Sequence, residues 1–507
     1  MTEDLGKDLR RSLVILTLVV IVTAWFSETF YFPDEHYQIL EFMAFKLGIT
    51  PASELPWEFG AHIRPWFQPL VYFLIAKPLM ILGVKDMFVI AFLLRLLTGL
   101  FSLLALAIFA KALLPAIEGE EEKRAFVRYL PLFGFLPYLF VRTASETFSA
   151  AFAALGVALA MGKPSPSRLG LAGLICGLAF ESRYQTGLLG LGLFLWLAVV
   201  ARARLAGMAA FLLGGAGALI LGAVADRWGY GEWVFPLPRY VDVNLIQGVA
   251  AHQFGREPVF AYLYLMPAQI FVAITLVLMA AMIATWLRNP RHPLTWATLP
   301  FVLAHVAIAH KEARFLFPLA ILATAFPVLG FSPKLALWRE MFTRFWSWRN
   351  SWAARIVTAL SLLAMAYFAL YPFGVRPHMP MAKYLYRLKP IDGPVFSFTE
   401  PFRSYPMFRP AGFKTEQLHG AEALDSHLAN GPVFLMTDTP VPPVLPANMR
   451  ATLLYSEFPL TRFGYGQLGA DYIRDYSAFA ARHRFLKLLP LYWYTLYRVE
   501  RSATMRS

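Results

Sequence analysis

Residues 87–114 read MFVIAFLLRLLTGLFSLLALAIFAKALL, and this run decides the class of protein. Only two of its side chains are charged, those of Arg95 and Lys111. The hydrocarbon core of a bilayer is about 30 Å thick, and a helix of about 20 apolar residues crosses it. The run is therefore long and apolar enough to predict a transmembrane helix.

Ten further apolar runs extend this pattern along the chain. They cover residues 12–27, 125–141, 145–162, 168–181, 184–201, 204–225, 259–287, 293–309, 314–331 and 353–371. With 58% hydrophobic and 15% charged residues among its 507, the chain is too apolar for a soluble protein. We expect a polytopic α-helical membrane protein with about 11 transmembrane helices.

The formal net charge of +14 comes from Lys and Arg scattered between the apolar runs, so nucleic acid is not an expected partner. Basic links instead mark the cytoplasmic side, and they occur at residues 111–128, 163–168, 202–204, 288–292 and 334–355. The first apolar run is expected to be an uncleaved helix with its N-terminus in the cytoplasm. If residues 67–84 are re-entrant or interfacial, all of these basic links also face the cytoplasm. The loops at residues 28–86 and 226–258 then lie on the outer face.

The composition changes after residue 371, where Pro, Gly and polar residues become more frequent and short strand-like runs appear at residues 394–398 and 432–436. We therefore expect a multi-span transmembrane domain over residues 1–372. Residues 373–507 are expected to form a small α/β domain on the outer face. The single cysteine, Cys176, excludes a disulfide framework and a cysteine-based metal site.

The first outer loop places Asp34, Glu35 and His36 directly after the first apolar run. Adjacent carboxylates and an imidazole beside a membrane surface are suited to take a proton as general base. The alternative is structural, because Pro33 followed by two acidic residues is also typical of the start of an interfacial helix. Gln38 follows in the same segment.

Cations occur at three other outer positions. His62 and Arg64 stand among aromatic residues, which is typical of an interfacial anchor or of a lipid-phosphate site. Arg183 interrupts an apolar stretch, where ionisable groups usually face a cavity or a partner. His310, Lys311 and Arg314 form the third group, and Lys311 and Arg314 would share one helix face toward a phosphate unless they snorkel.

Metal-binding motifs are missing from the sequence. The nearest approach to an Asp-x-Asp motif, at residues 242–244, reads DVN and lacks the second carboxylate. No glycine loop for phosphates and no zinc spacing stands out. We expect a metal-independent protein.

Several ordered segments resemble one family. Residues 32–38 read FPDEHYQ, residues 63–66 read IRPW, residues 226–231 read DRWGYG and residues 310–318 read HKEARFLFP. Together they are similar to the mannosyltransferases that use dolichyl-phosphate or polyprenyl-phosphate mannose, glycosyltransferase family 22, especially the branch that builds the glycosylphosphatidylinositol anchor. Phe32 and Ala313 depart from that family's His and Glu.

The resemblance implies a GT-C fold and an inverting transfer of mannose from a polyprenyl-phosphate donor to a glycolipid or lipid-linked glycan. Asp34 is then the expected base, with Glu35 as the second candidate or as a group that positions the acceptor. The candidates for binding donor phosphate or substrate are His62, Arg64, Arg183, His310, Lys311 and Arg314. The remaining loop candidates are His36, Gln38, Asp226 and Tyr230. No cofactor is expected.

The expected partners are membrane lipids, the donor and the acceptor, and the sequence leaves the oligomeric state open. The departures from the eukaryotic motifs favour a bacterial cytoplasmic membrane with an outer active site, or the endoplasmic reticulum if the source is eukaryotic. A secondary transporter or lipid flippase is the alternative class, although it calls for a repeat and midplane charges. A third alternative is a non-catalytic membrane scaffold whose outer domain binds a partner. Such a scaffold, unlike an enzyme, would tolerate the replacement of Asp34.

Overall fold

The computed structural model describes residues 2–269, 272–331, 352–370, 378–388, 393–399, 402, 405–410, 412–482 and 493–502. The chain forms two compact units. The first contains Met1–Ser27, Pro33–Lys85 and Val89–Pro372, and the second contains Glu28–Phe32, Asp86–Phe88 and Phe373–Ser507. The basic link predicted at residues 334–355 lies almost entirely outside the described residues.

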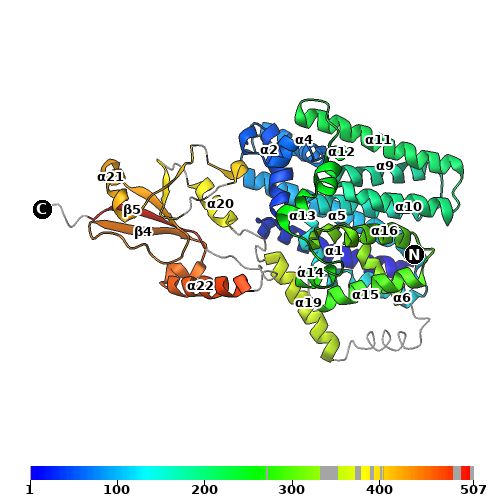
Figure 1. Ribbon diagram of the computed structural model, residues 1–507. Coiled ribbons are helices and arrows are strands. Elements are labelled where there is room, and N and C mark those ends of the chain that lie inside the picture. Colours follow the sequence, from blue (N-terminus) through cyan, green and yellow to red (C-terminus); the bar gives the residue numbers. More distant parts are fainter. Residues whose placement is uncertain are drawn as a thin grey trace. The chain divides into compact units, whose positions relative to one another are not determined.

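The first unit is helical (Figure 1). Its α-helices are α1 (Glu3–Phe26), α2 (Glu41–Lys46), α3 (Trp57–Ala61), α4 (Phe67–Ile81), α5 (Met87–Leu113), α6 (Glu120–Tyr129), α7 (Leu136–Phe140), α8 (Ser145–Ala160), α9 (Pro166–Ser182), α10 (Gly187–Val199), α11 (Leu205–Tyr230), α12 (Pro236–Val241), α13 (Val249–Phe254), α14 (Tyr262–Gln269), α15 (Val272–Arg288), α16 (Pro293–Ala307), α17 (Phe326–Gly330) and α19 (Trp352–Leu370). Two π-helices, η1 (Glu35–Leu40) and η6 (Asp242–Ile246), lie in the segments at residues 28–86 and 226–258.

Within the described ranges, three helices are long and apolar enough to cross a membrane: Glu3–Phe26, Met87–Ala116 and Leu205–Tyr230. A bent pair, Ala313–Leu319 with Leu322–Gly330, would add a fourth. Several shorter apolar helices of 10 to 17 residues accompany them, α4 and α8 among them. The prediction of a helical, multi-span membrane domain agrees with this architecture, whereas the number of 11 spans stays a prediction.

Two predicted spans are not continuous helices. The run at residues 125–141 is divided into α6, the 3₁₀ turn Leu130–Leu132 and α7. The run at residues 314–331 becomes the 3₁₀ helix η7 (Ala313–Leu319), a second 3₁₀ turn and α17, bent by 66°. Prolines inside both runs remove backbone donors and clash with the preceding turn, so apolarity alone overestimated the length of these helices.

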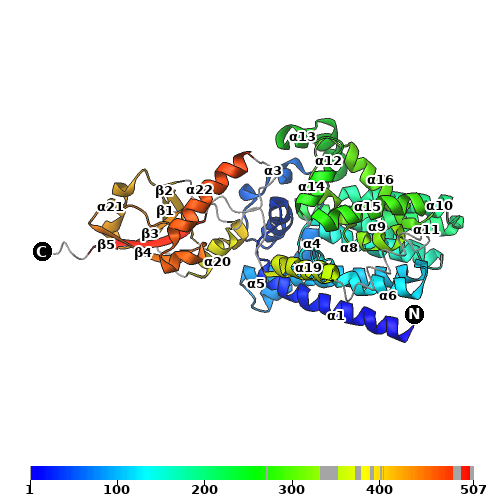
Figure 2. The same ribbon diagram turned by 90° about the horizontal axis from the view of Figure 1, so that it is seen from below.

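Close helix packing sets the framework of the first unit. Figure 1 shows α9, α10 and α11 side by side, and Figure 2 shows α1 beside α6. A Cβ atom at Gly173 of α9 would lie 1.9 Å from the carbonyl oxygen of Phe211 in α11. Likewise, a Cβ at Gly214 would lie 1.9 Å from the oxygen of Gly170. Only glycine allows these backbones to approach so closely, as is usual between membrane helices.

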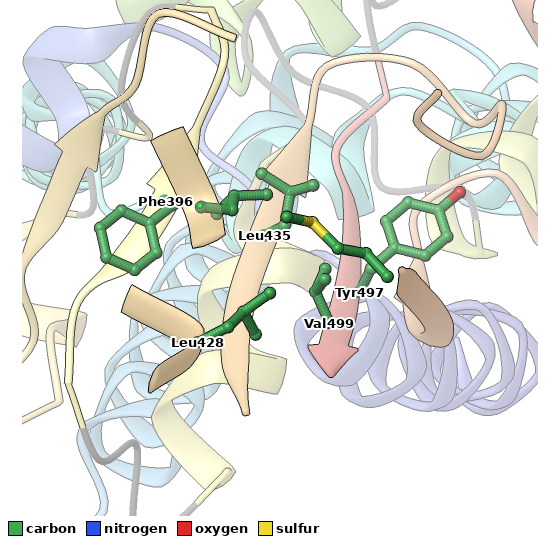
Figure 3. Close-up of a cluster of buried hydrophobic side chains, with 7 residues drawn as sticks. Phe396, Leu428, Leu435, Tyr497 and Val499 are labelled. Carbon is green, nitrogen blue, oxygen red and sulfur yellow. The ribbon is translucent and has the colours of Figure 1, made fainter. Parts of the chain in front are cut away.

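The second unit contains a five-stranded mixed sheet in the order β2-β1-β3-β5-β4. The strands are β1 (Val395–Ser397), β2 (Thr415–Gln417), β3 (Val433–Thr437), β4 (Met449–Ser456) and β5 (Thr495–Arg501), accompanied by α20 (Met379–Arg387), α21 (Leu424–His427) and α22 (Gly466–Arg482). β1 pairs in parallel with β2 and β3, while β5 is antiparallel to β3 and β4. Figure 3 shows Phe396, Leu428, Leu435, Tyr497 and Val499 in the core of this unit.

Candidate active site

Asp34 stands at the start of a π-helix in the segment between α1 and α4. Pro33 precedes it, and Glu35–Leu40 form the helix that follows. Its Oδ2 lies 2.8 Å from Nη1 of Arg314 and 4.0 Å from Nη2 of Arg64. Burial favours the neutral acid, but the charges of Arg314 and Arg64 outweigh it and hold the pKa of Asp34 below its usual range. Asp34 is therefore an ionised carboxylate.

Arg314 is surrounded by carboxylates. It comes from the start of η7, and two of its nitrogens contact the carboxylate of Glu312, at 2.7 Å and 3.1 Å. Its Nη1 also lies 3.6 Å from Oε1 of Glu146. Burial opposes ionisation of Glu312, yet the charge of Arg314 holds its pKa well below the usual range. Such a fork fixes both partners in position as well as in charge.

Arg183 continues this cluster from the end of α9. It lies at the C-cap in an extended conformation, which directs the side chain away from the helix that precedes it. Its Nη1 is 2.9 Å from Oε1 of Glu146 and donates to Oγ of Ser145 at 3.2 Å. Its Nε is buried and has no hydrogen-bond partner among the described residues. A donor of this kind remains available to a bound anion.

A pocket opens beside the cluster. It holds about 360 Å³ of empty space, including solvent at its mouth. Its lining comes from the first loop, the start of α8, the end of α9 and α12: Gln38, Ile39, Arg64, Pro65, Ser145, Ser182, Arg183, Tyr184, Gln185 and Tyr240. Two guanidinium groups, those of Arg64 and Arg183, thus belong both to the pocket and to the charged cluster around Asp34. The two guanidinium groups suit the pocket to an anionic ligand.

Glu35, His36 and Gln38 are turned into the protein. Glu35 accepts hydrogen bonds from the backbone and side chain of Thr143, at 2.8 Å and 3.1 Å. Nε2 of His36 is 2.6 Å from Glu41, and both side chains are almost fully buried. Gln38 is also largely buried but reaches the pocket, and it donates to Glu58 at 2.9 Å. These contacts order the π-helix that begins next to Asp34.

His310 and Lys311 differ from the expected arrangement. Residues 308–312 are not helical, because η7 begins only at Ala313. Lys311 and Arg314 therefore do not share a helix face, and that prediction is wrong. Nζ of Lys311 donates to the carbonyl oxygens of Glu257, at 3.1 Å, and Ile308, while Arg314 contacts Asp34.

His62, the other basic candidate in residues 28–86, contacts the loop at residues 226–258. Its Nδ1 lies 2.7 Å from a guanidinium nitrogen of Arg239 in α12. The residue itself has a left-handed backbone with φ of 54° at the end of α3. His310 has a carboxylate partner instead, since its Nε2 is 3.0 Å from Glu312. That hydrogen bond raises the pKa of His310 above its usual value.

Asp226 and Tyr230, one turn apart near the end of α11, hold the backbone of the first loop. Oδ1 of Asp226 accepts the backbone N–H of Trp66 at 2.8 Å. The hydroxyl of Tyr230 donates to the carbonyl of Arg64 at 2.9 Å and accepts its N–H at 3.3 Å. The two side chains therefore fix Arg64 relative to the helix, which gives them a positioning role.

Removing the Tyr230 hydroxyl tests this role. We expect Tyr230→Phe to lower the stability by about 1 kcal/mol, the usual net value of a hydrogen bond. Asp226→Asn keeps an acceptor oxygen for Trp66 and is expected to be nearly neutral, whereas Asp226→Leu is not. Denaturation temperatures of the purified variants in detergent measure the effect. Equal temperatures for Asp226→Asn and Asp226→Leu would contradict the role of Asp226.

Sequence reasoning did not select Glu146 and Glu312 as site residues, although the structure places both on Arg314. Glu146 lies in the first turn of α8, where an acidic residue is common for purely helical reasons. Glu312 directly follows Lys311 in the sequence, where a carboxylate that neutralises a neighbouring cation is the ordinary expectation. Among the described residues, no group of three or more His, Cys, Asp or Glu is arranged to hold a metal ion.

The fold resembles that of a membrane protein of known structure. The structure is similar to ArnT from Cupriavidus metallidurans bound to undecaprenyl phosphate, with a TM-score of 0.50, 13% identity, 84% of this chain and 93% of that chain covered. The apo form of the same protein gives a TM-score of 0.51 over 84% of this chain and 92% of that one, at 13% identity. The fold is thus that of the GT-C membrane glycosyltransferases.

The family follows from the sequence itself. The model of the Alg9-like mannosyltransferase family matches residues 12–388, so the chain belongs to that family. It is also 29% identical over 367 residues to GPI mannosyltransferase 3 of Yarrowia lipolytica, which covers 70% of this chain and 67% of the relative. The protein is a multi-pass membrane mannosyltransferase, as the resemblance implied.

Proposed function

We propose that the protein transfers mannose from a polyprenyl-phosphate donor to a hydroxyl of a glycolipid or lipid-linked glycan, with inversion, so that an α-mannoside forms. The observation that carries this proposal is an ionised Asp34 held by Arg314 beside a pocket lined by Arg64 and Arg183. The fold relative crystallised with undecaprenyl phosphate favours a lipid-phosphate donor. The name of the yeast relative refers to a glycolipid acceptor.

In the proposed reaction, the acceptor hydroxyl attacks the anomeric carbon of a β-linked mannosyl phosphate. Asp34 takes the hydroxyl proton, the new C–O bond forms on the opposite face, and the bond to phosphate oxygen breaks with its electron pair. The leaving group is a polyprenyl phosphate that carries one more negative charge. Arg64 and Arg183 are the groups that we assign to this charge, since guanidinium groups bind phosphate in a fork.

Arg314 acts on the base. It keeps Asp34 ionised before the substrate arrives, but so close a cation also weakens Asp34 as a proton acceptor. An entering phosphate attracts the same guanidinium, and this competition would strengthen the base when the donor is bound. Glu35 is held by Thr143, so we assign it a positioning role and leave the proton transfer to Asp34.

Because cationic side chains line the pocket, we expect no requirement for a divalent ion. Transfer should continue in EDTA at no less than about half of its rate, since guanidinium groups replace the metal as charge acceptors. Addition of Mg²⁺ or Mn²⁺ to chelated, purified protein is the measurement. A loss of transfer in EDTA that Mn²⁺ restores would contradict this prediction.

We further propose that the chain crosses the membrane about eleven times and presents this site on the outer face. The support is the distribution of basic links, which the positive-inside rule assigns to the cytoplasm. A bacterial cytoplasmic membrane is our proposed location. Trp233 is exposed in the loop at residues 226–258. It can therefore be used to test which side of the membrane this loop faces. The thiol of a Trp233→Cys variant should react with an impermeant reagent in right-side-out vesicles only.

The stereochemical proposal has its own test. Wild type in nanodiscs is incubated with synthetic β-mannosyl polyprenyl phosphate and a lipid extract, and the labelled product is digested with α-mannosidase or β-mannosidase. Release of label by the α-specific enzyme alone is expected. A β-linked product would mean that the transfer retains configuration and would remove the argument for a single base.

A further inference from the structure

The first outer loop passes from one compact unit to the other and back. Helix α1 ends at Phe26, and Ser27 still belongs to the first unit. The five residues Glu28–Phe32 belong to the second unit, and the chain returns to the first at Pro33. Asp34 follows one residue later. The segment that leads into the proposed base is therefore held by a unit that does not itself contain Asp34.

Two side chains attach this segment to the second unit. Glu28 forms an ion pair with Nζ of Lys383 on α20, and both side chains are less than a quarter exposed. Phe30 is buried and meets the ring of Tyr405 edge to face, with centroids 5.2 Å apart. Thr29 between them is also buried. The segment is thus packed on both sides of its chain.

Helix α20 is itself fixed within the second unit. Glu457 accepts the N–H of Met381 at 3.3 Å and lies 3.2 Å from Nδ1 of His378, at the start of the helix. Tyr384 stacks on Tyr455 of β4 with centroids 4.6 Å apart. Lys383 therefore sits on an element that is anchored to the sheet.

Helix α20 also contacts the first residues of α5. The hydroxyl of Tyr386 accepts the N–H of Met87 at 3.3 Å, at the start of α5. Phe88 packs against Tyr386 and against Phe408, with centroids 5.4 Å and 4.3 Å apart. The region that matches the family model ends at residue 388, so it includes α20 but excludes the sheet.

Little slack separates the held segment from Asp34. Two residues reach at most about 7 Å, and Pro33 has a ring-locked φ and restricts the backbone of Phe32 before it. At the other end of the loop, the carbonyl of Ser27 is held by Arg142 at 2.8 Å. Few free backbone dihedrals therefore separate Phe30 from Asp34, which limits how much of a shift of Phe30 the chain between them can absorb.

We propose that the second unit positions the catalytic base, with α20 as the element that grips the loop and Glu28, Phe30 and Lys383 as positioning residues. This inference rests on the proposed function, because it takes Asp34 as the base. Small displacements of a reacting group lower the chemical rate more than they lower substrate binding. The unit thus sets the turnover of a site built elsewhere in the chain.

The test uses full-length protein in nanodiscs and two independent measurements. Lys383→Gln and Phe30→Ala are expected to lower kcat about tenfold while the KM for the donor stays within about twofold, since binding groups are untouched. Hydrogen–deuterium exchange in residues 28–41 should become faster in both. The charge swap that combines Glu28→Lys with Lys383→Glu should restore both measurements toward wild type. Arg501→Gln breaks an ion pair with Asp425 elsewhere in the same unit and is the matched control.

The outcomes separate the two claims. Wild-type kcat in Lys383→Gln and Phe30→Ala, or exchange in residues 28–41 that does not change, would overturn this inference and leave the proposed function intact. An equal fall in kcat in Arg501→Gln would also overturn it. So would a charge-swap variant whose kcat is as low as that of Lys383→Gln. Absence of transfer by wild type would instead refute the proposed function, whatever the exchange data show.

Discussion

Asp34→Asn is expected to lower kcat by roughly 10²- to 10⁴-fold, the usual contribution of a general base. Asparagine keeps the size of the side chain and its hydrogen bond to Arg314 but cannot accept the acceptor's proton. The KM for the donor should change little, because the phosphate is assigned to Arg64 and Arg183. Initial rates with purified, monodisperse protein at saturating donor measure the effect.

Asp242→Asn is the matched control, since Asp242 also lies at the start of a π-helix and accepts a hydrogen bond from Gln247 at 2.7 Å. It should retain wild-type turnover. If Asp34→Asn turned over within about threefold of wild type, far below the range of a general base, the assignment of Asp34 would be wrong. The neighbouring Glu146 would then be the next carboxylate to replace.

Arg314→Gln is expected to cost about 3–5 kcal/mol of stability, because removing one partner of a buried ion pair leaves charges uncompensated. In this case three carboxylates lose their shared cation: Asp34, Glu146 and Glu312. Arg314→Lys keeps the charge but not the fork, so its loss of stability should be smaller. Transfer should fall in both variants.

The stability of Arg314→Gln should also depend on pH in the direction opposite to that of wild type. In wild type the pKa of Asp34 is lowered, so its ionised form contributes stability above its ordinary pKa of 3.8 that is lost as the pH falls through the lowered value. Without Arg314 only the more distant Arg64 opposes the effect of burial on Asp34. We therefore expect the pKa of Asp34 to rise and the variant to regain stability as the pH falls. Denaturation temperatures between pH 4 and pH 8 test this. A deficit that grows toward low pH would contradict the account.

Much of the helical framework was predictable because apolarity is a local property. The run at residues 87–114 becomes α5, and the runs near residues 204–225 and 293–309 become α11 and α16. Prolines limited this reasoning, since Pro131 and Pro137 interrupt a run that hydropathy alone treats as one helix. A local pattern cannot decide whether tertiary contacts compensate for a proline.

The site was predictable only in part, for a physical reason. Asp34 could be selected as a carboxylate in a loop beside the membrane surface and Arg314 as a cation between apolar runs, but their ion pair depends on how the helices pack. Glu146 has the sequence context of an ordinary helix start, and only its contacts with Arg183 and Arg314 distinguish it. Lys311 shows the opposite error, because a helical spacing was assumed where the chain is not helical.

The most direct test compares donors. Purified wild type and Asp34→Asn are each given labelled mannose on polyprenyl phosphate or on guanosine diphosphate, with the same lipid extract as acceptor. The account predicts labelled glycolipid only from the lipid-linked donor and only with wild type. Label transferred from the nucleotide donor, or equal transfer by folded Asp34→Asn, would contradict it.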